Sequence, residues 1–180
     1  MRIIMAGLLA LAASLLMPCP ARASETDGLA ALRARYHCEL AARLAKLKAA
    51  KGRSNRFIIV ADVLRPFHFA QCLFDADGER VLCEASSGFF TQRDGGPRRY
   101  VPSLQTVAAL ARLGFSTDDS QGNFQRALEA RTDDQVSQIA DLLLATLHHA
   151  YGVRLETLLH IEAPLAPLSR KERARCLPMS

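Results

Sequence analysis

Apolar residues recur three and four positions apart through residues 27–51, which is the pattern of an amphipathic helix. Thr26 or Asp27 can cap its start, and Gly52 can stop it. The opposite side of this helix is rich in alanine and includes Cys38. Such a stripe is either a solvent face made of good helix formers or a second packing surface, such as that of a dimer. The core stripe consists of Leu29, Leu32, Tyr36, Leu40, Leu44 and Leu47.

A β-hairpin is predicted next, because residues 67–75 and 79–86 have strand-like alternation on either side of Asp77-Gly78, a dipeptide typical of a type I′ turn. A two-residue loop there places Cys72 opposite Cys83, at a spacing that suits a disulfide. A three-residue loop would shift the register by one residue. On the first register, one face of the hairpin holds both cysteines among apolar residues. The other face is mixed and carries Gln71, Leu73, Asp75, Arg80, Leu82 and Glu84.

Three further segments have strand character. Residues 56–63 (RFIIVADV) form a continuous apolar run rich in β-branched residues, which predicts a strand covered on both faces. Residues 122–130 alternate weakly and are expected as another strand, whereas residues 154–162 fit either a short helix or a strand.

Two later helices complete the predicted fold. One runs from about Pro102 to Gly114, with Phe115 placed to pack back on the helix beyond the glycine. The other begins at a capping box, Thr132 with Gln135, and ends at Gly152. The predicted class is therefore α+β: an N-terminal helix, an antiparallel sheet of about four strands with a central hairpin, and two later helices.

The N-terminus has the features of a cleaved signal peptide. A basic start is followed by an apolar run shorter than the ~20 residues that a transmembrane anchor needs, and small residues stand at Ala21 and Ala23. Cleavage near Ala23 would remove residues 1–23 and place the protein in the periplasm or outside the cell. Residues 24–163 are then expected to form one domain, and residues 164–180 a basic, proline-containing mobile tail.

Cleavage also moderates the charge of the chain. Residues 1–23 hold Arg2 and Arg22 and no acidic residue, so the net charge falls by two, from +5 to +3. The remaining basic residues concentrate in residues 43–56 and in the tail, as is usual for solvated segments. Nucleic-acid binding is therefore not expected.

Four cysteines remain after the loss of Cys19, and an even count in an oxidising compartment favours disulfides. Pairing of Cys72 with Cys83 leaves Cys38 and Cys176 for each other or for a second copy of the chain. The sequence contains no CxxC motif and no pairs of cysteines or histidines at zinc-ligand spacing. We expect no metal and no cofactor.

Catalytic motifs are absent from the sequence: it has no nucleophile elbow, phosphate-binding loop, dinucleotide fingerprint or HExxH. His148 and His149 are neighbours on a predicted helix, where side chains point about 100° apart, so they cannot bind one ion from the same face. The remaining enzymatic hypothesis is a hydrolase in which Cys176 acts with His160 or His149.

Residues 110–159 (LARLGFSTDDSQGNFQRALEARTDDQVSQIADLLLATLHHAYGVRLETLL) combine a leucine-rich helix ending in Leu-Gly-aromatic, Asn-Phe before a short strand, and a helix closing on Tyr-Gly-Val. This run resembles the TY-Chap family, relatives of type III secretion chaperones and YbjN-like proteins. With the hairpin, the resemblance covers about residues 56–160 and implies a peptide-binding chaperone module without catalytic residues. The chain differs where the family pattern has tryptophan, because Phe115 and Gln125 stand there and the chain has no Trp.

The predicted sheet has more apolar surface than one layer of helices covers, so a captured extended segment or a second copy would complete its burial. The alternative is a sheet covered on one face by the first helix and on the other by the later pair. We therefore predict a non-catalytic, chaperone-like protein- or peptide-binding module; a small disulfide-stapled envelope protein is the alternative function. The predicted partner-binding residues are Ile58, Val60, Leu73, Leu82, Phe89, Phe90 and Phe115.

Overall fold

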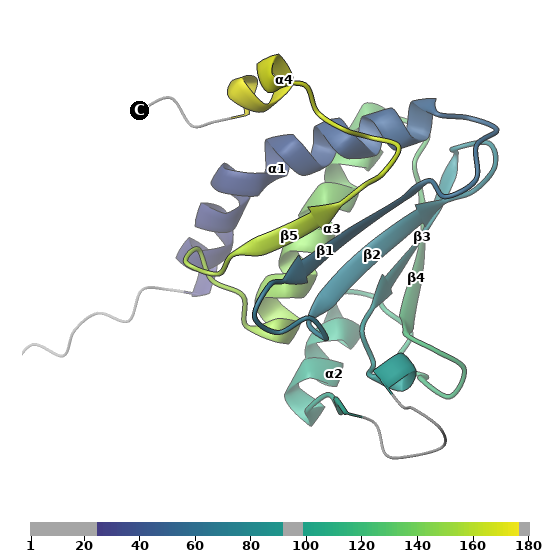
Figure 1. The fold of residues 1–180 in the computed structure, drawn as a ribbon. Helices are drawn as coiled ribbons and strands as arrows, with labels where there is room; N and C mark the ends of the chain where they lie inside the picture. Colours follow the sequence, from purple (N-terminus) through teal and green to yellow (C-terminus); the bar gives the residue numbers. More distant parts are fainter. Residues whose placement is uncertain (1–24, 92–98, 177–180) are drawn as a thin grey trace, which may run out of the picture.

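The computed structural model describes residues 25–91 and 99–176, and within them the chain folds into an α+β domain with an antiparallel sheet (Figure 1). The predicted class is confirmed. The strands are β1 (Phe57–Asp62), β2 (Phe69–Phe74), β3 (Arg80–Ala85), β4 (Phe124–Glu129) and β5 (Leu159–Glu162), in the order β4-β3-β2-β1-β5. The helices are α1 (Glu25–Ala49), α2 (Leu104–Arg112), α3 (Asp133–Tyr151) and α4 (Arg170–Arg175), with a 3₁₀ turn η1 (Phe89–Thr91).

The sheet has five strands rather than about four, because the ambiguous segment before residue 163 is a strand. Leu159 to Glu162 pair antiparallel with β1. The expected signal peptide lies outside the described residues. Within residues 25–91 and 99–176, no helix is long and apolar enough to cross a membrane.

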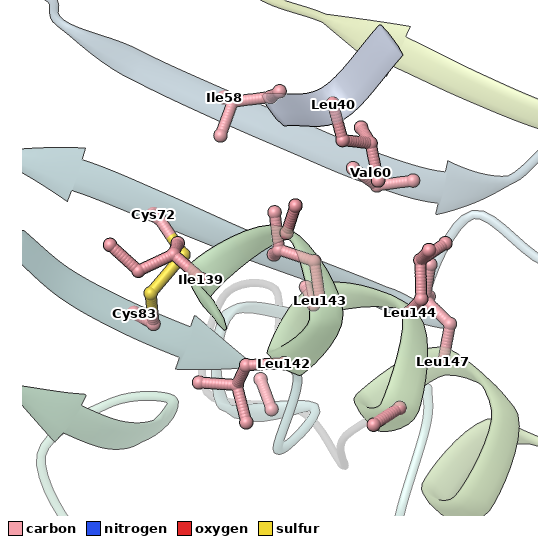
Figure 2. Close-up of a cluster of buried hydrophobic side chains, with 14 of the residues drawn as sticks. Leu40, Ile58, Val60, Cys72, Cys83, Ile139, Leu142, Leu143, Leu144 and Leu147 are labelled. Carbon is pink, nitrogen blue, oxygen red and sulfur yellow. A yellow bond between two sulfur atoms is a disulfide. The ribbon is translucent and has the colours of Figure 1, made fainter. Parts of the chain in front are cut away.

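The helices cover one face of the sheet. α1 and α3 pack against each other, and both contact the sheet; in Figure 1 α3 passes behind β1 and β5, and α1 runs alongside β5. Figure 2 shows Leu40 of α1 and Leu143 of α3 in one cluster with Ile58 and Val60 of β1. Helices on both faces, the alternative considered from the sequence, are therefore not observed. The prediction that β1 is covered on both faces is also wrong, because its buried and part-buried residues alternate.

The alanine stripe of α1 is mainly a solvent face. Ala34, Ala45 and Ala49 are exposed, whereas the leucine stripe on the other side is buried. The exceptions within the stripe are Ala31 and Ala41, which are part-buried, and Cys38, which forms a disulfide with Cys176. The small side chains therefore serve helix formation over most of this face.

The hairpin has the predicted register but a different turn. Cys72 lies opposite Cys83, and the two form a disulfide. Among the described residues only Asn55 combines a positive φ with a side chain, so Asp77 does not have the positive φ that a type I′ turn requires. Residues 76–79 instead form a four-residue loop, in which Gly78 takes the left-handed conformation and its N–H donates to the Asp75 carbonyl. Two- and four-residue loops centred on the same bond give the same register.

Caps set the ends of the later helices. The capping box of Thr132 and Gln135 is confirmed at the start of α3. α2 is capped by the Ser103 side chain, so Pro102 lies before the helix rather than in its first turn. At its end, Gly114 is left-handed and the Phe115 N–H donates to the Leu110 carbonyl, a Schellman arrangement that packs Phe115 into the core.

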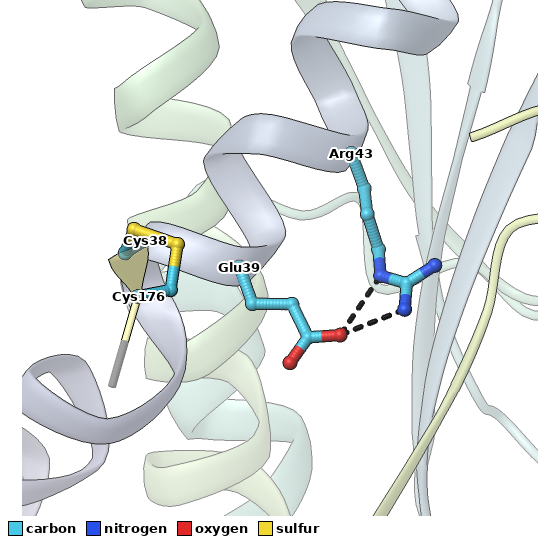
Figure 3. The surroundings of a disulfide bond; sticks show 4 residues. All are labelled: Cys38, Glu39, Arg43 and Cys176. Atoms are coloured by element: carbon cyan, nitrogen blue, oxygen red, sulfur yellow. Dashed lines mark hydrogen bonds and ion pairs between the residues drawn. A yellow bond between two sulfur atoms is a disulfide. The ribbon is translucent and has the colours of Figure 1, made fainter. Parts of the chain in front are cut away.

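Residues 163–176, here called the C-terminal strap, lie along α1. A mobile tail was predicted for residues 164–180, of which the structure describes residues 164–176. Figure 3 shows the Cys38–Cys176 disulfide beside the Glu39–Arg43 ion pair. Arg43 and Lys46 donate to backbone carbonyls of the strap, and Lys46 also pairs with Glu172. Hydrogen bonds from Lys46 and from Ser169 lower the pKa of Glu172 to about 2. These contacts join residues more than 120 positions apart, so local sequence patterns do not reveal them.

Asp62, at the end of β1, makes the fold sensitive to acid. Burial alone would raise its pKa, but the Arg65 side chain and the backbone N–H groups of Leu64 and Arg65 donate to the carboxylate and lower the pKa below 3.8. A lowered folded-state pKa stabilises the fold above the unfolded pKa, and this contribution is lost as the pH falls through the folded-state value.

We expect Asp62→Asn to lower the free energy of unfolding by about 1 kcal/mol at pH 7, because the charge-assisted hydrogen bonds are lost. Arg65 is half exposed, so solvent screening limits the effect. The difference from wild type should shrink as the pH falls below 3.8. Urea titrations from pH 7 to pH 2 measure it, and a difference that stays constant over this range would contradict the assignment.

Candidate partner-binding face

The face of the sheet that the helices leave uncovered is here called the outer face. Its side chains form rows across the strands, set by the antiparallel register. Leu73 is 48% exposed and Leu82 36% exposed, at the centre of the apolar row. The apolar row is Phe57, Leu73, Leu82 and Ala127, and the next row is Glu162, Ile59, Gln71, Glu84 and Gln125.

The outer face is hollowed around Leu73. A shallow hollow of about 340 Å³ spans β1, β2 and β3. Two neighbouring hollows, of about 310 Å³ beside the hairpin and about 400 Å³ beside the connection from α1, also reach Leu73. The first is lined by Asn55, Phe57, Ile59, Gln71, Cys72, Leu73, Leu82 and Glu84. A partner segment placed here would contact apolar side chains first and polar ones at the margin.

Leu73 and Leu82 are the two predicted binding residues that the structure brings together on this face, where they are directly paired. Ile58, Val60 and Phe115 are buried in the core instead. The two β1 residues point toward the helices because alternate residues of a strand face opposite sides. Phe115 is buried because the glycine cap of α2 turns it inward. These three side chains are not exposed to a partner.

Phe89 and Phe90 lie away from the leucine pair. They form η1, which follows the end of β3 remote from the hairpin loop. Phe90 is exposed, and the two rings meet edge to face with centroids 5.0 Å apart. The structure therefore places them in a separate apolar spot, beside Gly122.

Phe57 and Ile59 belong to the outer face, although sequence reasoning did not select them. Their spacing indicates a shared face, because residues two apart on a strand point to the same side, and Ile58 between them points to the other. The continuous apolar run hid this signal, because both phases of β1 are apolar and periodicity does not show which one meets the helices.

The polar row is organised around Glu84. The side-chain amides of Gln71 and Gln125 donate to its two carboxylate oxygens, one from each neighbouring strand, with 3.1 Å between Gln125 Nε2 and Glu84 Oε1. This arrangement fixes the Glu84 carboxylate at the hollow that Leu73 and Leu82 also line.

The residues of the hydrolase hypothesis are not assembled into a site. Cys176 is bonded to Cys38, so it offers no thiol. The two histidines of this hypothesis are both exposed, His149 on α3 and His160 on β5. Within the described part of the chain, no three histidine, cysteine or acidic side chains are grouped to hold a metal ion.

One further histidine lies in an aromatic cluster. The ring of His68 lies 5.2 Å from that of Tyr100 and 5.3 Å from that of Tyr151. Burial, followed by the charge of Arg65, lowers the pKa of His68 although Asp62 opposes the shift. The lowered pKa favours the neutral imidazole, which stacks on the Tyr151 ring.

Comparison with known proteins assigns the chain to a family. No curated protein and no solved structure matches the chain significantly. One family model matches residues 34–164, more than half of the chain, and therefore covers the whole sheet, α2, α3 and most of α1. The family, TY-Chap3, is described as T3SS (YopN, CesT) and YbjN peptide-binding chaperone 3. The chain belongs to this TY-Chap3 family of peptide-binding chaperones.

Proposed function

We propose that this protein is a non-catalytic, chaperone-like module that holds a segment of a partner polypeptide on the outer face. One observation carries the proposal: α1 and α3 cover a single face of the sheet, and the other face presents Leu73 and Leu82 in a hollowed apolar row. Covering their exposed surface contributes on the order of 1 kcal/mol for each leucine. Membership of a peptide-binding chaperone family supports the same activity.

The proposed compartment is the periplasm or the exterior of the cell. Two disulfides join the four cysteines of residues 25–176, and disulfides persist in oxidising compartments. The apolar N-terminal segment, with small residues before Ser24, supports export. The partner polypeptide would then be one that passes through or resides in the same compartment.

Replacing both Leu73 and Leu82 by aspartate tests the face. We expect peptide affinity to fall at least about tenfold, because apolar contact is lost and two carboxylates would be desolvated on binding. Peptides selected from a random library on the wild-type protein serve as probes, and fluorescence anisotropy gives their affinity. Circular dichroism checks that the variant remains folded.

The matched control replaces Leu64 and Leu158 by aspartate. Both are exposed leucines outside the two rows, so the same chemical change should leave affinity unaltered. Equal affinity of the Leu73/Leu82 variant and wild type would remove the outer face as the site. A loss of peptide affinity in both variants would show a general effect of the added negative charge and not an effect of the outer face.

A further inference from the structure

The outer face contains a carboxylate that lacks a cationic partner. Among the described residues, Glu84 forms no ion pair, whereas other carboxylates near the sheet are paired: Asp75 with Arg80 and Glu129 with Arg131. Glu162, in the same row as Glu84, likewise has no ion pair among those residues. Within residues 25–91 and 99–176, the row therefore presents negative charge without an ion-pair partner beside the apolar row.

The Glu84 carboxylate is held between the side-chain amides of two neighbouring strands. Gln71 and Gln125 donate to one oxygen each, and an ionised carboxylate has about four acceptor positions, so acceptor capacity remains on both oxygens. The residue is part-buried and lines the central hollow together with Leu73 and Leu82. An oriented, partly desolvated carboxylate interacts more strongly with a cation than a freely rotating one does.

We propose that the outer face recognises extended partner segments in which a lysine or arginine stands two residues from an apolar side chain. The cation would sit on Glu84 while the apolar side chain covers Leu82 and Leu73. This inference rests on the proposed function and specifies the chemistry of the partner. Leu82 and Glu84 are two residues apart on one strand, about 6.6 Å, and side chains at i and i+2 of an extended peptide have the same spacing.

The test is a selection from a random nonapeptide library on the full mature chain, in wild-type and variant forms. Wild type should enrich peptides with Lys or Arg two positions from an aliphatic or aromatic residue. Glu84→Gln keeps the shape of the side chain and removes its charge, so the affinity of a selected peptide should fall about three- to tenfold. Raising the salt concentration should weaken wild-type binding more than binding by Glu84→Gln.

Two variants serve as controls. Glu156→Gln makes the same change of charge in the exposed loop before β5, away from the outer face, and should leave affinity unchanged. Glu84→Lys should reverse the preference, so that selected peptides carry Asp or Glu in place of the basic residue.

The outcomes separate this inference from the proposed function. Suppose that the selected peptides bind wild type and lose affinity for Leu73→Asp. If they then show no enrichment of Lys or Arg, or bind Glu84→Gln as tightly as wild type, the inference is overturned and the proposed function stands. Failure to obtain any peptide sensitive to Leu73→Asp would overturn both. Light scattering tests whether a second copy of the chain binds the outer face. A wild-type dimer that dissociates in Leu73→Asp and in Glu84→Gln would assign the face to a second copy and overturn the inference.

Discussion

Replacing Cys38 and Cys176 by alanine is expected to lower the free energy of unfolding by about 4–5 kcal/mol. The disulfide joins residues 138 positions apart and so restricts nearly the whole unfolded chain. Its loss also removes the covalent anchor of the C-terminal strap. The strap is then held by the Lys46–Glu172 pair, by one hydrogen bond each from Arg43 and Lys46 to its carbonyls, and by its buried alanine and leucine side chains. Urea denaturation followed by circular dichroism measures the change, and alkylation with and without reductant confirms the bond in the purified protein.

The Cys72–Cys83 disulfide allows a comparison of how a short and a long closed loop contribute to stability. It closes a separation of 11 residues, for which chain entropy contributes only about 3 kcal/mol. Both cysteines are buried in the core, so their replacement by alanine also removes packing. A Cys38/Cys176 variant within about 1 kcal/mol of wild type would contradict the proposed role of the long-range bond. Free alkylation of Cys176 in the unreduced protein would contradict the bond itself.

Gly88→Ala is expected to lower the free energy of unfolding by about 3 kcal/mol. Gly88 has a φ of +78°, which costs an alanine about 1 kcal/mol. An added Cβ would also lie 1.9 Å from the Tyr100 carbonyl oxygen, a backbone atom, so the two segments must move apart. Such a displacement adds about 1–3 kcal/mol.

Gly52→Ala is the matched control for this position. Gly52 has nearly the same φ, +71°, but a Cβ there meets nothing within 4 Å. Its replacement should therefore cost only the conformational term, about 1 kcal/mol. Thermal and urea denaturation of the two variants would separate strain from close approach. Equal stability of the two would show that Tyr100 does not pack against Gly88 as the structure places it.

The state of the Cys38–Cys176 disulfide bears on which partner peptides the protein can meet. If the long-range disulfide forms in the mature protein, the chain matures in an oxidising compartment, and the peptides to consider are those present there. If Glu84 acts as proposed, its charge selects among these peptides. The two leucines would then provide affinity for many apolar segments, whereas the single oriented carboxylate would discriminate among them.

Several features followed from the sequence by itself because they depend on local periodicity and local chemistry. The Asp77-Gly78 turn signal between two alternating segments predicted that Cys72 lies opposite Cys83, one of two registers considered, and the capping box of Thr132 and Gln135 marked the start of α3. The helix, hairpin and Tyr-Gly-Val patterns also identified the family that the comparison shows. Each of these signals lies within a few residues of the feature that it specifies.

The tertiary structure alone decided which surfaces are available. β1 is apolar in both phases, so only the packing of α1 and α3 shows that Ile58 and Val60 are buried while Phe57 and Ile59 face outward. The strap along α1 depends on a bond across 138 residues, which no local pattern encodes. Periodicity specifies which side chains share a face, but burial depends on what packs against that face, and that is set by contacts between segments distant in the chain.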